Sequence, residues 1–134
     1  MSGTKILLVE DDMLLRELYT TILERAGYTL LIGTDGEEAM GLVESTPDIK
    51  LILLDVMLPK VHGIEVLKRL KSNLSTEKIP VLLLTNLTEE SIVQEALRLG
   101  AVGYLVKVRL TPKEVVQKVR ELVGDPSGQN PETK

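Results

Sequence analysis

The stretch from Ile49 to Asp55 reads IKLILLD and is apolar at almost every position before its final acid. Aliphatic side chains on both faces of an extended segment are typical of a strand in a parallel sheet that helices cover on both sides. Four other runs along the chain share this character. The five predicted strands are Lys5–Val9, Thr29–Ile32, Ile49–Leu54, Pro80–Leu84 and Val102–Val106.

Between these runs, apolar residues recur at the three- and four-residue spacing of helices. The clearest stripes are Leu14, Leu15, Leu18, Ile22 and Leu23, then Ile64, Leu67 and Leu70, then Ile92, Val93, Ala96, Leu97 and Leu99. Strands that alternate with helices predict an α/β fold of the (βα)5 type. We therefore expect a doubly wound, flavodoxin-like parallel sheet with the strand order 2-1-3-4-5.

Residues typical of helix ends fall at the expected boundaries. Asp35 with Glu38, and Thr111 with Glu114, have the spacing of a capping box at a helix N-terminus. Gly27 can adopt the left-handed conformation that ends the first helix. These residues support the predicted alternation independently of the apolar pattern.

The 134 residues suffice for one domain, which we expect over residues 4–123, followed by a disordered tail or linker stub over residues 124–134. The absence of Cys excludes disulfides, thiolate metal sites and cysteine nucleophiles. A formal charge of −4, with three Tyr and no Phe or Trp, argues against direct nucleic-acid binding. The apolar runs are too short to span a membrane and no leader pattern begins the chain, so we expect a cytoplasmic protein.

Polar residues follow four of the predicted strands. They are Glu10, Asp11 and Asp12 after the first strand, Asp55 after the third, Thr85 after the fourth and Lys107 after the fifth. Parallel strands end at one edge of the sheet, so these residues should form one pocket. Clustered carboxylates favour a hard cation such as Mg²⁺, and a lysine and a hydroxyl beside them can stabilise a phosphoryl group in transfer. The pattern predicts Asp55 as the acceptor nucleophile.

Four motifs make the chain resemble bacterial response-regulator receiver domains over residues 4–123. They are ILLVEDD at 6–12, LILLDVMLP at 51–59, VLLLTN at 81–86 and GAVGYLVK at 100–107. The resemblance implies that Asp55 is phosphorylated, that Lys107 contacts the phosphoryl group, and that Thr85 and Tyr104 are the switch residues.

The same resemblance implies a Mg²⁺ site. Asp11, Asp55 and the backbone carbonyl of Met57 would be direct ligands, and Glu10 would act mostly through water. The implied partners are a sensor histidine kinase or phosphotransfer protein as donor and a downstream protein or output domain as target.

Each singled-out residue also has an ordinary structural interpretation. Asp12 and His62 fit as helix caps, and we prefer that interpretation to a role in metal binding or phosphoryl transfer. Lys107 could extend its ammonium group into water from a strand end. Thr85 could be a strand-end hydroxyl, and Tyr104 a half-buried strand aromatic.

The chain departs from the family pattern at several positions. Val108 follows Lys107 where many receivers have a cis-proline, and we expect a trans peptide here. Asn86 follows Thr85 where a small residue is usual, so access to Asp55 is expected to be narrower. Met57 and Leu87 are apolar at the two variable positions near the phosphoryl group.

Those two apolar residues are expected to cover the phosphoryl group and to slow its loss by hydrolysis. Val102 and Gly103 lack the acidic pair of receivers with winged-helix outputs, which weakens the case for dimerisation through the fourth helix and fifth strand.

Two other functions fit the pattern less well than a switch. A small aspartyl-phosphate phosphatase or phosphotransferase usually has a second acid two residues after its nucleophile, and Met57 stands there instead. A flavodoxin-like cofactor carrier would need a Ser/Thr/Gly-rich phosphate loop after the first strand, which the chain lacks. We therefore expect a signalling switch and not a turnover enzyme.

Overall fold

The computed structural model describes residues 4–58, 62–85, 90–107 and 111–126. Its centre is a five-stranded sheet with the order β2-β1-β3-β4-β5, in which every neighbouring pair is parallel. The strands are β1 Lys5–Val9, β2 Thr29–Gly33, β3 Ile49–Asp55, β4 Val81–Thr85 and β5 Gly103–Val106. The predicted fold class and strand order are confirmed, and no strand end differs from the prediction by more than one residue.

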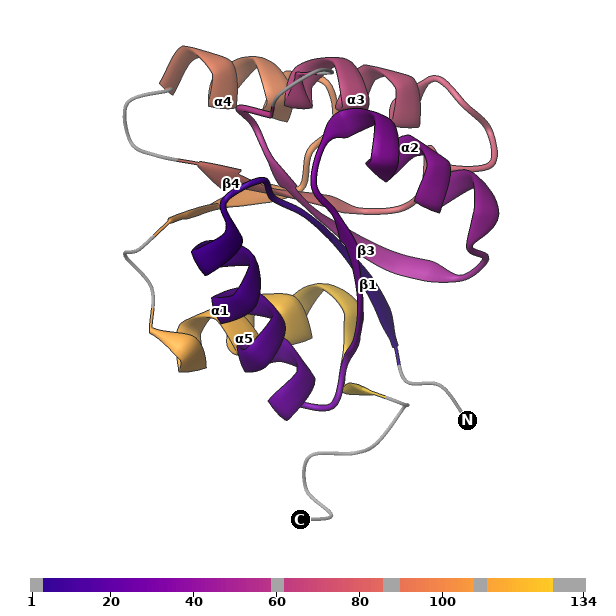
Figure 1. Ribbon diagram of the computed structural model, residues 1–134. Coiled ribbons are helices and arrows are strands. Elements are labelled where there is room, and N and C mark those ends of the chain that lie inside the picture. Colours follow the sequence, from indigo (N-terminus) through magenta and orange to yellow (C-terminus); the bar gives the residue numbers. More distant parts are fainter. Residues whose placement is uncertain (1–3, 59–61, 86–89, 108–110, 127–134) are drawn as a thin grey trace.

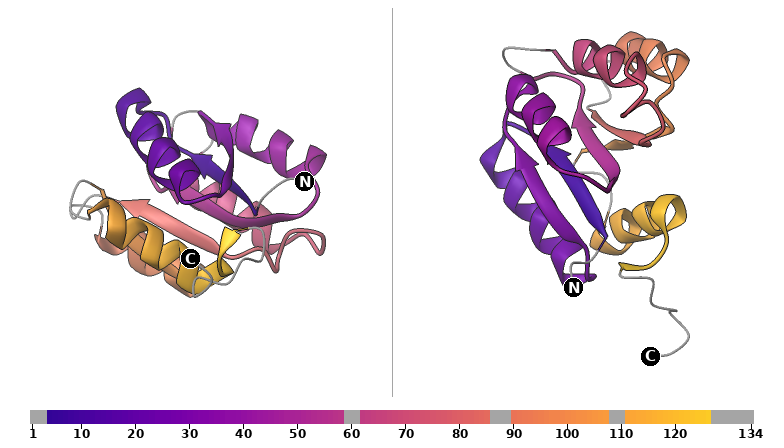
Figure 2. Two further views of the ribbon diagram at one scale, coloured as in Figure 1. Left: turned by 90° about the horizontal axis from the view of Figure 1, so that it is seen from below. Right: turned by 90° about the vertical axis from the view of Figure 1, so that its right-hand side faces the viewer.

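Helices cover both faces of the sheet (Figures 1 and 2). One face carries α1 Met13–Arg25 and α5 Pro112–Val123, and the other carries α2 Gly36–Ser45, α3 Gly63–Lys71 and α4 Glu90–Arg98. The described part of the chain contains no helix with the length and apolar content that crossing a bilayer requires.

The central strand β3 supplies side chains to both sides of the sheet. Leu51 and Leu53 pack in the cluster under α1 and α5, whereas Ile52 and Leu54 pack in the cluster under α2, α3 and α4. Burial on both faces explains why β3 is aliphatic at nearly every position, with Lys50 as the exposed exception.

The first helix shows where the apolar pattern misled. Leu14 and Leu18 were expected on the buried stripe but are 73% and 48% exposed, while Tyr19 and Leu23 are buried. Apolar residues at positions 13–15, 18–19 and 22–23 cover more than half of the helix circumference. Only part of that surface can face the sheet, and the spacing alone does not indicate which part.

The predicted caps form, with one difference. Thr111 and Glu114 make a complete capping box at the start of α5, with Pro112 in the first turn. At α2 the Asp35 side chain accepts from the Glu38 N–H, but the Glu38 carboxylate accepts from the N–H and hydroxyl of Thr34. Gly27 has the expected positive φ, at 105°.

The chain continues to pack after α5 ends. The Tyr28 hydroxyl donates to the Gly124 carbonyl over 2.7 Å, and Arg120 Nε lies 2.7 Å from Asp125 Oδ1. A Cβ on Gly27 would stand 3.0 Å from Pro126 Cγ, so these residues are in close contact. We call the contacts among Gly27, Tyr28, Arg120 and Gly124–Pro126 the C-terminal latch. The rest of the predicted tail lies outside the described residues, and the boundary at residue 124 stays a prediction.

Candidate functional site

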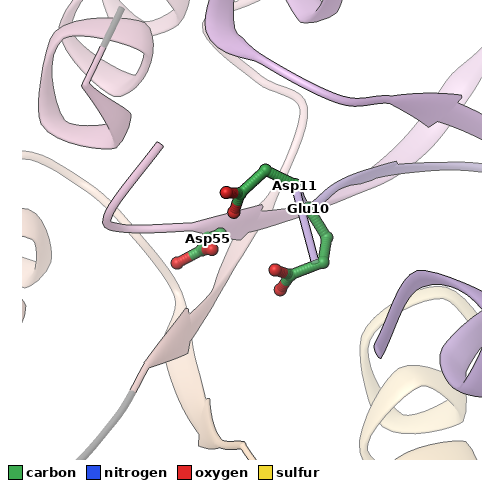
Figure 3. Close-up of side chains that lie close together, drawn as sticks. All are labelled: Glu10, Asp11 and Asp55. Carbon is green, nitrogen blue, oxygen red and sulfur yellow. The ribbon is translucent and has the colours of Figure 1, made fainter. Parts of the chain in front are cut away.

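Three carboxylates lie together at the carboxyl edge of the sheet (Figure 3). Glu10 and Asp11 directly follow β1, and Asp55 is the last residue of β3, the strand beside β1. One oxygen of each carboxylate lies within 4.8 Å of the others. Glu10 is 0% exposed and Asp55 is 2% exposed, whereas Asp11 is open to solvent.

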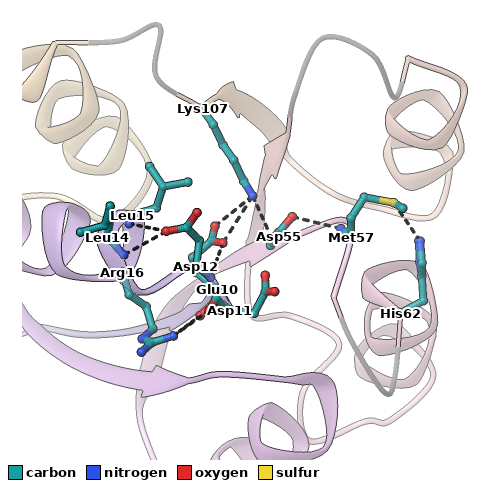
Figure 4. Close-up of polar contacts among 10 residues, drawn as sticks. All are labelled: Glu10, Asp11, Asp12, Leu14, Leu15, Arg16, Asp55, Met57, His62 and Lys107. Atoms are coloured by element: carbon teal, nitrogen blue, oxygen red, sulfur yellow. Dashed lines mark hydrogen bonds and ion pairs between the residues drawn. The ribbon is translucent and has the colours of Figure 1, made fainter.

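Lys107 places its ammonium group between the two buried acids (Figure 4). Nζ lies 2.8 Å from Asp55 Oδ2 and 3.1 Å from Glu10 Oε1. The Lys107 backbone N–H donates to the Thr85 carbonyl over 2.8 Å, which anchors the end of β5 to the end of β4. Among the described residues, the two buried acids therefore share the Lys107 ammonium group.

This arrangement leaves an excess of negative charge in the cluster. Burial, followed by the charge of Asp55, raises the pKa of Glu10 to about 7, although Lys107 and the Asp12 N–H act in the opposite direction. Burial disfavours the charged form of Lys107, but its hydrogen bond to Asp55 and the charges of Asp55 and Glu10 outweigh burial and raise its pKa. Glu10 Oε1 is buried and accepts no hydrogen bond of good geometry. An additional cation would stabilise this cluster.

The residues present fit a magnesium ion. Mg²⁺ takes oxygen ligands, commonly one or two carboxylates, and retains several waters. The cluster offers two buried carboxylates and an exposed one through which water can reach the site. The cluster found among the described residues consists of carboxylates, which agrees with a hard cation.

Asp12 belongs to α1 and not to the cluster. Its Oδ1 accepts from the N–H groups of Leu14 and Leu15 at 2.9 and 3.2 Å, so it is the N-cap of that helix. Its own N–H donates to Glu10 Oε2 over 3.1 Å. The predicted capping role of Asp12 is confirmed.

The sequence pattern did not identify Arg16 as a residue of the site. Its Nη1 lies 3.0 Å from the carbonyl oxygen of Asp11 and 3.3 Å from that of Glu10, so it ties the first turn of α1 to the acidic segment. A signal was available, because a cation in the first turn of a helix is disfavoured by the helix dipole and calls for a compensating contact.

The switch residues lie at different depths. Thr85 is buried at the end of β4, one residue after Leu84, which pairs with Asp55 of the neighbouring β3. Tyr104 is 47% exposed on β5 and is not part of the cluster. Its side chain borders a shallow groove between β5 and α5. The roles predicted for these two residues stay predictions, and Asn86, Leu87 and Val108 lie outside the described residues.

Met57 and His62 extend the site toward α3. The Met57 N–H donates to Asp55 Oδ1 over 3.0 Å, whereas the Met57 sulfur lies 3.2 Å from His62 Nε2. His62 is the N-cap of α3, as expected, because its Nδ1 accepts from the Ile64 N–H. The ligand role predicted for the Met57 carbonyl stays a prediction.

Comparisons with known proteins found matches over most of the chain. The family model described as response regulator receiver domain matches residues 6–120. The transcriptional regulatory protein CpxR of Klebsiella pneumoniae is 40% identical over 119 residues, which cover 89% of this chain and 49% of CpxR. The alkaline phosphatase synthesis transcriptional regulatory protein PhoP of Bacillus subtilis is 42% identical over 120 residues, or 89% of this chain and 48% of PhoP.

A solved structure is similar over nearly its whole length. It is a putative response regulator from Chloroflexus aurantiacus, with a TM-score of 0.83 and 29% identity over 90% of this chain and 97% of the other. By contrast, the chain spans about half the length of the two curated relatives.

Proposed function

This chain belongs to the response regulator receiver domain family, the phospho-accepting switches of two-component signalling, and we propose that Asp55 is its phosphoacceptor. The observation that carries the proposal is the position of Asp55. It is a buried carboxylate at the end of the central strand, 2.8 Å from Lys107 and within the acidic cluster. An oxygen in this position has a cation ready to neutralise the charge of an incoming phosphoryl group.

The proposed reaction is a phosphoryl transfer from phosphohistidine. A carboxylate oxygen of Asp55 forms a bond to phosphorus while the phosphorus–nitrogen bond breaks, and the released imidazole takes up a proton. Lys107 pairs with the phosphoryl oxygens, and the Thr85 hydroxyl donates to one of them. Asp11, Asp55 and the Met57 carbonyl would hold Mg²⁺, with Glu10 acting through water. The ion would supply the charge neutralisation that three acids and a phosphoryl group require.

We place the phosphodonor outside this chain. The only histidine, His62, has Nδ1 occupied as a helix cap and Nε2 against Met57. A sensor histidine kinase or a phosphotransfer protein would therefore supply the phosphoryl group. A downstream protein or output domain would respond to Thr85 and Tyr104 after phosphorylation.

The curated relatives are transcriptional regulators about twice as long as this chain. If this receiver also acts on DNA, an attached output domain would make that contact. Receiver domains act in the cytoplasm, and we propose the same location here.

The function is that of a switch and not of a phosphatase that turns over substrate. Met57 offers no acid two residues after Asp55 to act on a leaving group. It also offers no polar atom suited to orienting a water for attack on the aspartyl phosphate. We propose that self-dephosphorylation is slow for this reason.

Incubation with acetyl phosphate and Mg²⁺ tests the proposal. We expect intact-mass spectrometry to show one added phosphoryl group, and we expect the Asp55→Asn variant to show none. Glu44→Gln, which removes an acid from α2 far from the cluster in sequence, serves as the control and should label normally. Full labelling of Asp55→Asn would refute the assignment.

A further inference from the structure

The Met57 side chain, which the sequence predicts to cover the phosphoryl group, instead points toward His62 and away from the phosphoacceptor. In Figure 4 it leaves the backbone beside Asp55 and runs toward His62 at the start of α3. Its sulfur lies 3.2 Å from His62 Nε2, and 45% of the residue is exposed. A long thioether with three rotatable bonds can adopt other conformations when that contact is lost.

The helix cap fixes the orientation of the His62 ring. Nδ1 accepts from the Ile64 N–H over 3.1 Å, so this nitrogen carries no proton. The ring proton is thereby assigned to Nε2, and that N–H points at the Met57 sulfur, a weak acceptor. One imidazole therefore serves both the helix cap and the thioether.

The start of α3 is also fixed relative to Asp55. A Cβ on Gly63 would stand 2.5 Å from the Asp55 carbonyl oxygen and 2.8 Å from Val56 Cα. The first turn of α3 therefore packs directly against the end of β3. An imidazole held at this helix start keeps a constant position relative to the phosphoacceptor.

We propose that His62 is a positioning residue that holds the Met57 side chain away from Asp55 and so keeps the phosphoacceptor accessible. This inference rests on the function proposed for Asp55. Without the contact, the thioether would spend more time over the carboxylate, where it would obstruct both the phosphodonor and the attacking water. Phosphorylation and hydrolysis would then slow together.

His62→Asn tests the proposal, because Asn is a good N-cap but has no donor in the position of Nε2. The rate of labelling by acetyl phosphate and the decay of the aspartyl phosphate are measured in the Met57 and Met57→Ala backgrounds, and each His62→Asn variant is compared with its own His62 parent. With Met57 present, we expect both rates to fall about two- to tenfold, the factor that corresponds to a sulfur contact of ordinary strength. In the Met57→Ala background, His62→Asn should change neither rate.

A second readout does not depend on phosphorylation. The chain has four methionines, and ¹³C-methyl labelling gives a signal for each, with that of Met57 identified by its loss in Met57→Ala. His62→Asn should move the Met57 methyl signal and leave that of Met40 unchanged. An unmoved Met57 signal, unchanged rates with Met57 present, or equal slowing in both backgrounds would each overturn the proposal. Failure of the function proposed for Asp55 would be seen separately, as labelling that survives Asp55→Asn.

Discussion

Asp11 and Asp12 are identical acids at consecutive positions, but their side chains make different contacts. Asp11 lies in the carboxylate cluster, whereas Asp12 is engaged with the N-terminus of α1. The two residues are therefore a matched pair for separating electrostatic from structural effects.

Replacing Asp11 by Ala should weaken Mg²⁺ binding by about tenfold or more, because a proposed direct ligand is lost. In the metal-free protein the same change removes repulsion within the cluster. The free energy of unfolding should rise by up to about 1 kcal/mol, a small gain because Asp11 is exposed. A magnesium titration followed by NMR, together with urea denaturation without metal, measures both quantities.

Asp12→Ala is the control for Asp11→Ala. It should lower the free energy of unfolding by about 1 kcal/mol through loss of the N-cap and should retain Mg²⁺ affinity. The opposite result, with Mg²⁺ binding lost in Asp12→Ala and kept in Asp11→Ala, would move the metal site by one residue.

At the level of secondary-structure elements, α1 contacts the backbone of the acidic segment that follows β1. Arg16 reaches back from the first turn to the carbonyl groups of Glu10 and Asp11, so the helix and the acidic segment are tied together. We expect the orientation of Asp11 to depend on these two contacts.

Arg16→Met should lower Mg²⁺ affinity by about tenfold while changing the free energy of unfolding little. The two lost hydrogen bonds are partly offset, because a cation is removed from the helix N-terminus. Arg25→Met, at the opposite end of α1, is the matched control and should leave Mg²⁺ affinity unchanged. Equal losses of affinity in both variants would contradict a specific role of the Arg16 contacts, because removal of a positive charge by itself should strengthen Mg²⁺ binding.

The elements differ in how well the sequence predicts them. The strands were predicted to within one residue because a parallel sheet buries both strand faces and leaves an unbroken aliphatic run. The side of α1 that faces the sheet was not predicted correctly, because apolar residues surround more than half of this helix. The gathering of Glu10, Asp11, Asp55 and Lys107 followed from topology alone. The contact between His62 and Met57 could not be predicted, since it depends on side-chain conformations.

At the level of the whole molecule, the C-terminal latch joins residues nearly a hundred positions apart. Tyr28 follows the turn between α1 and β2 and is 3% exposed, and its hydroxyl donates to Gly124 just after α5. The latch therefore joins the end of α5 to the segment between α1 and β2, on the face of the sheet that carries both helices.

Tyr28→Phe should lower the free energy of unfolding by about 1 kcal/mol, the usual contribution of such a hydrogen bond. The carbonyl of Gly124 would lose its partner while the ring stayed packed. Tyr104→Phe, which removes an exposed hydroxyl, should have no measurable effect. Urea denaturation of the two variants makes the comparison, and an equal response in both would show that the latch contributes nothing to stability.

The C-terminal latch also determines where a mechanical load would enter the domain. Tension applied through residues beyond Pro126 meets the Tyr28 hydrogen bond and the contact with Gly27 before it reaches the last turn of α5. The force is thus transmitted to the turn before β2, which is the edge strand that pairs with β1. Pulling on this end would strain the sheet at β2, and α5 would peel away only after the latch had broken.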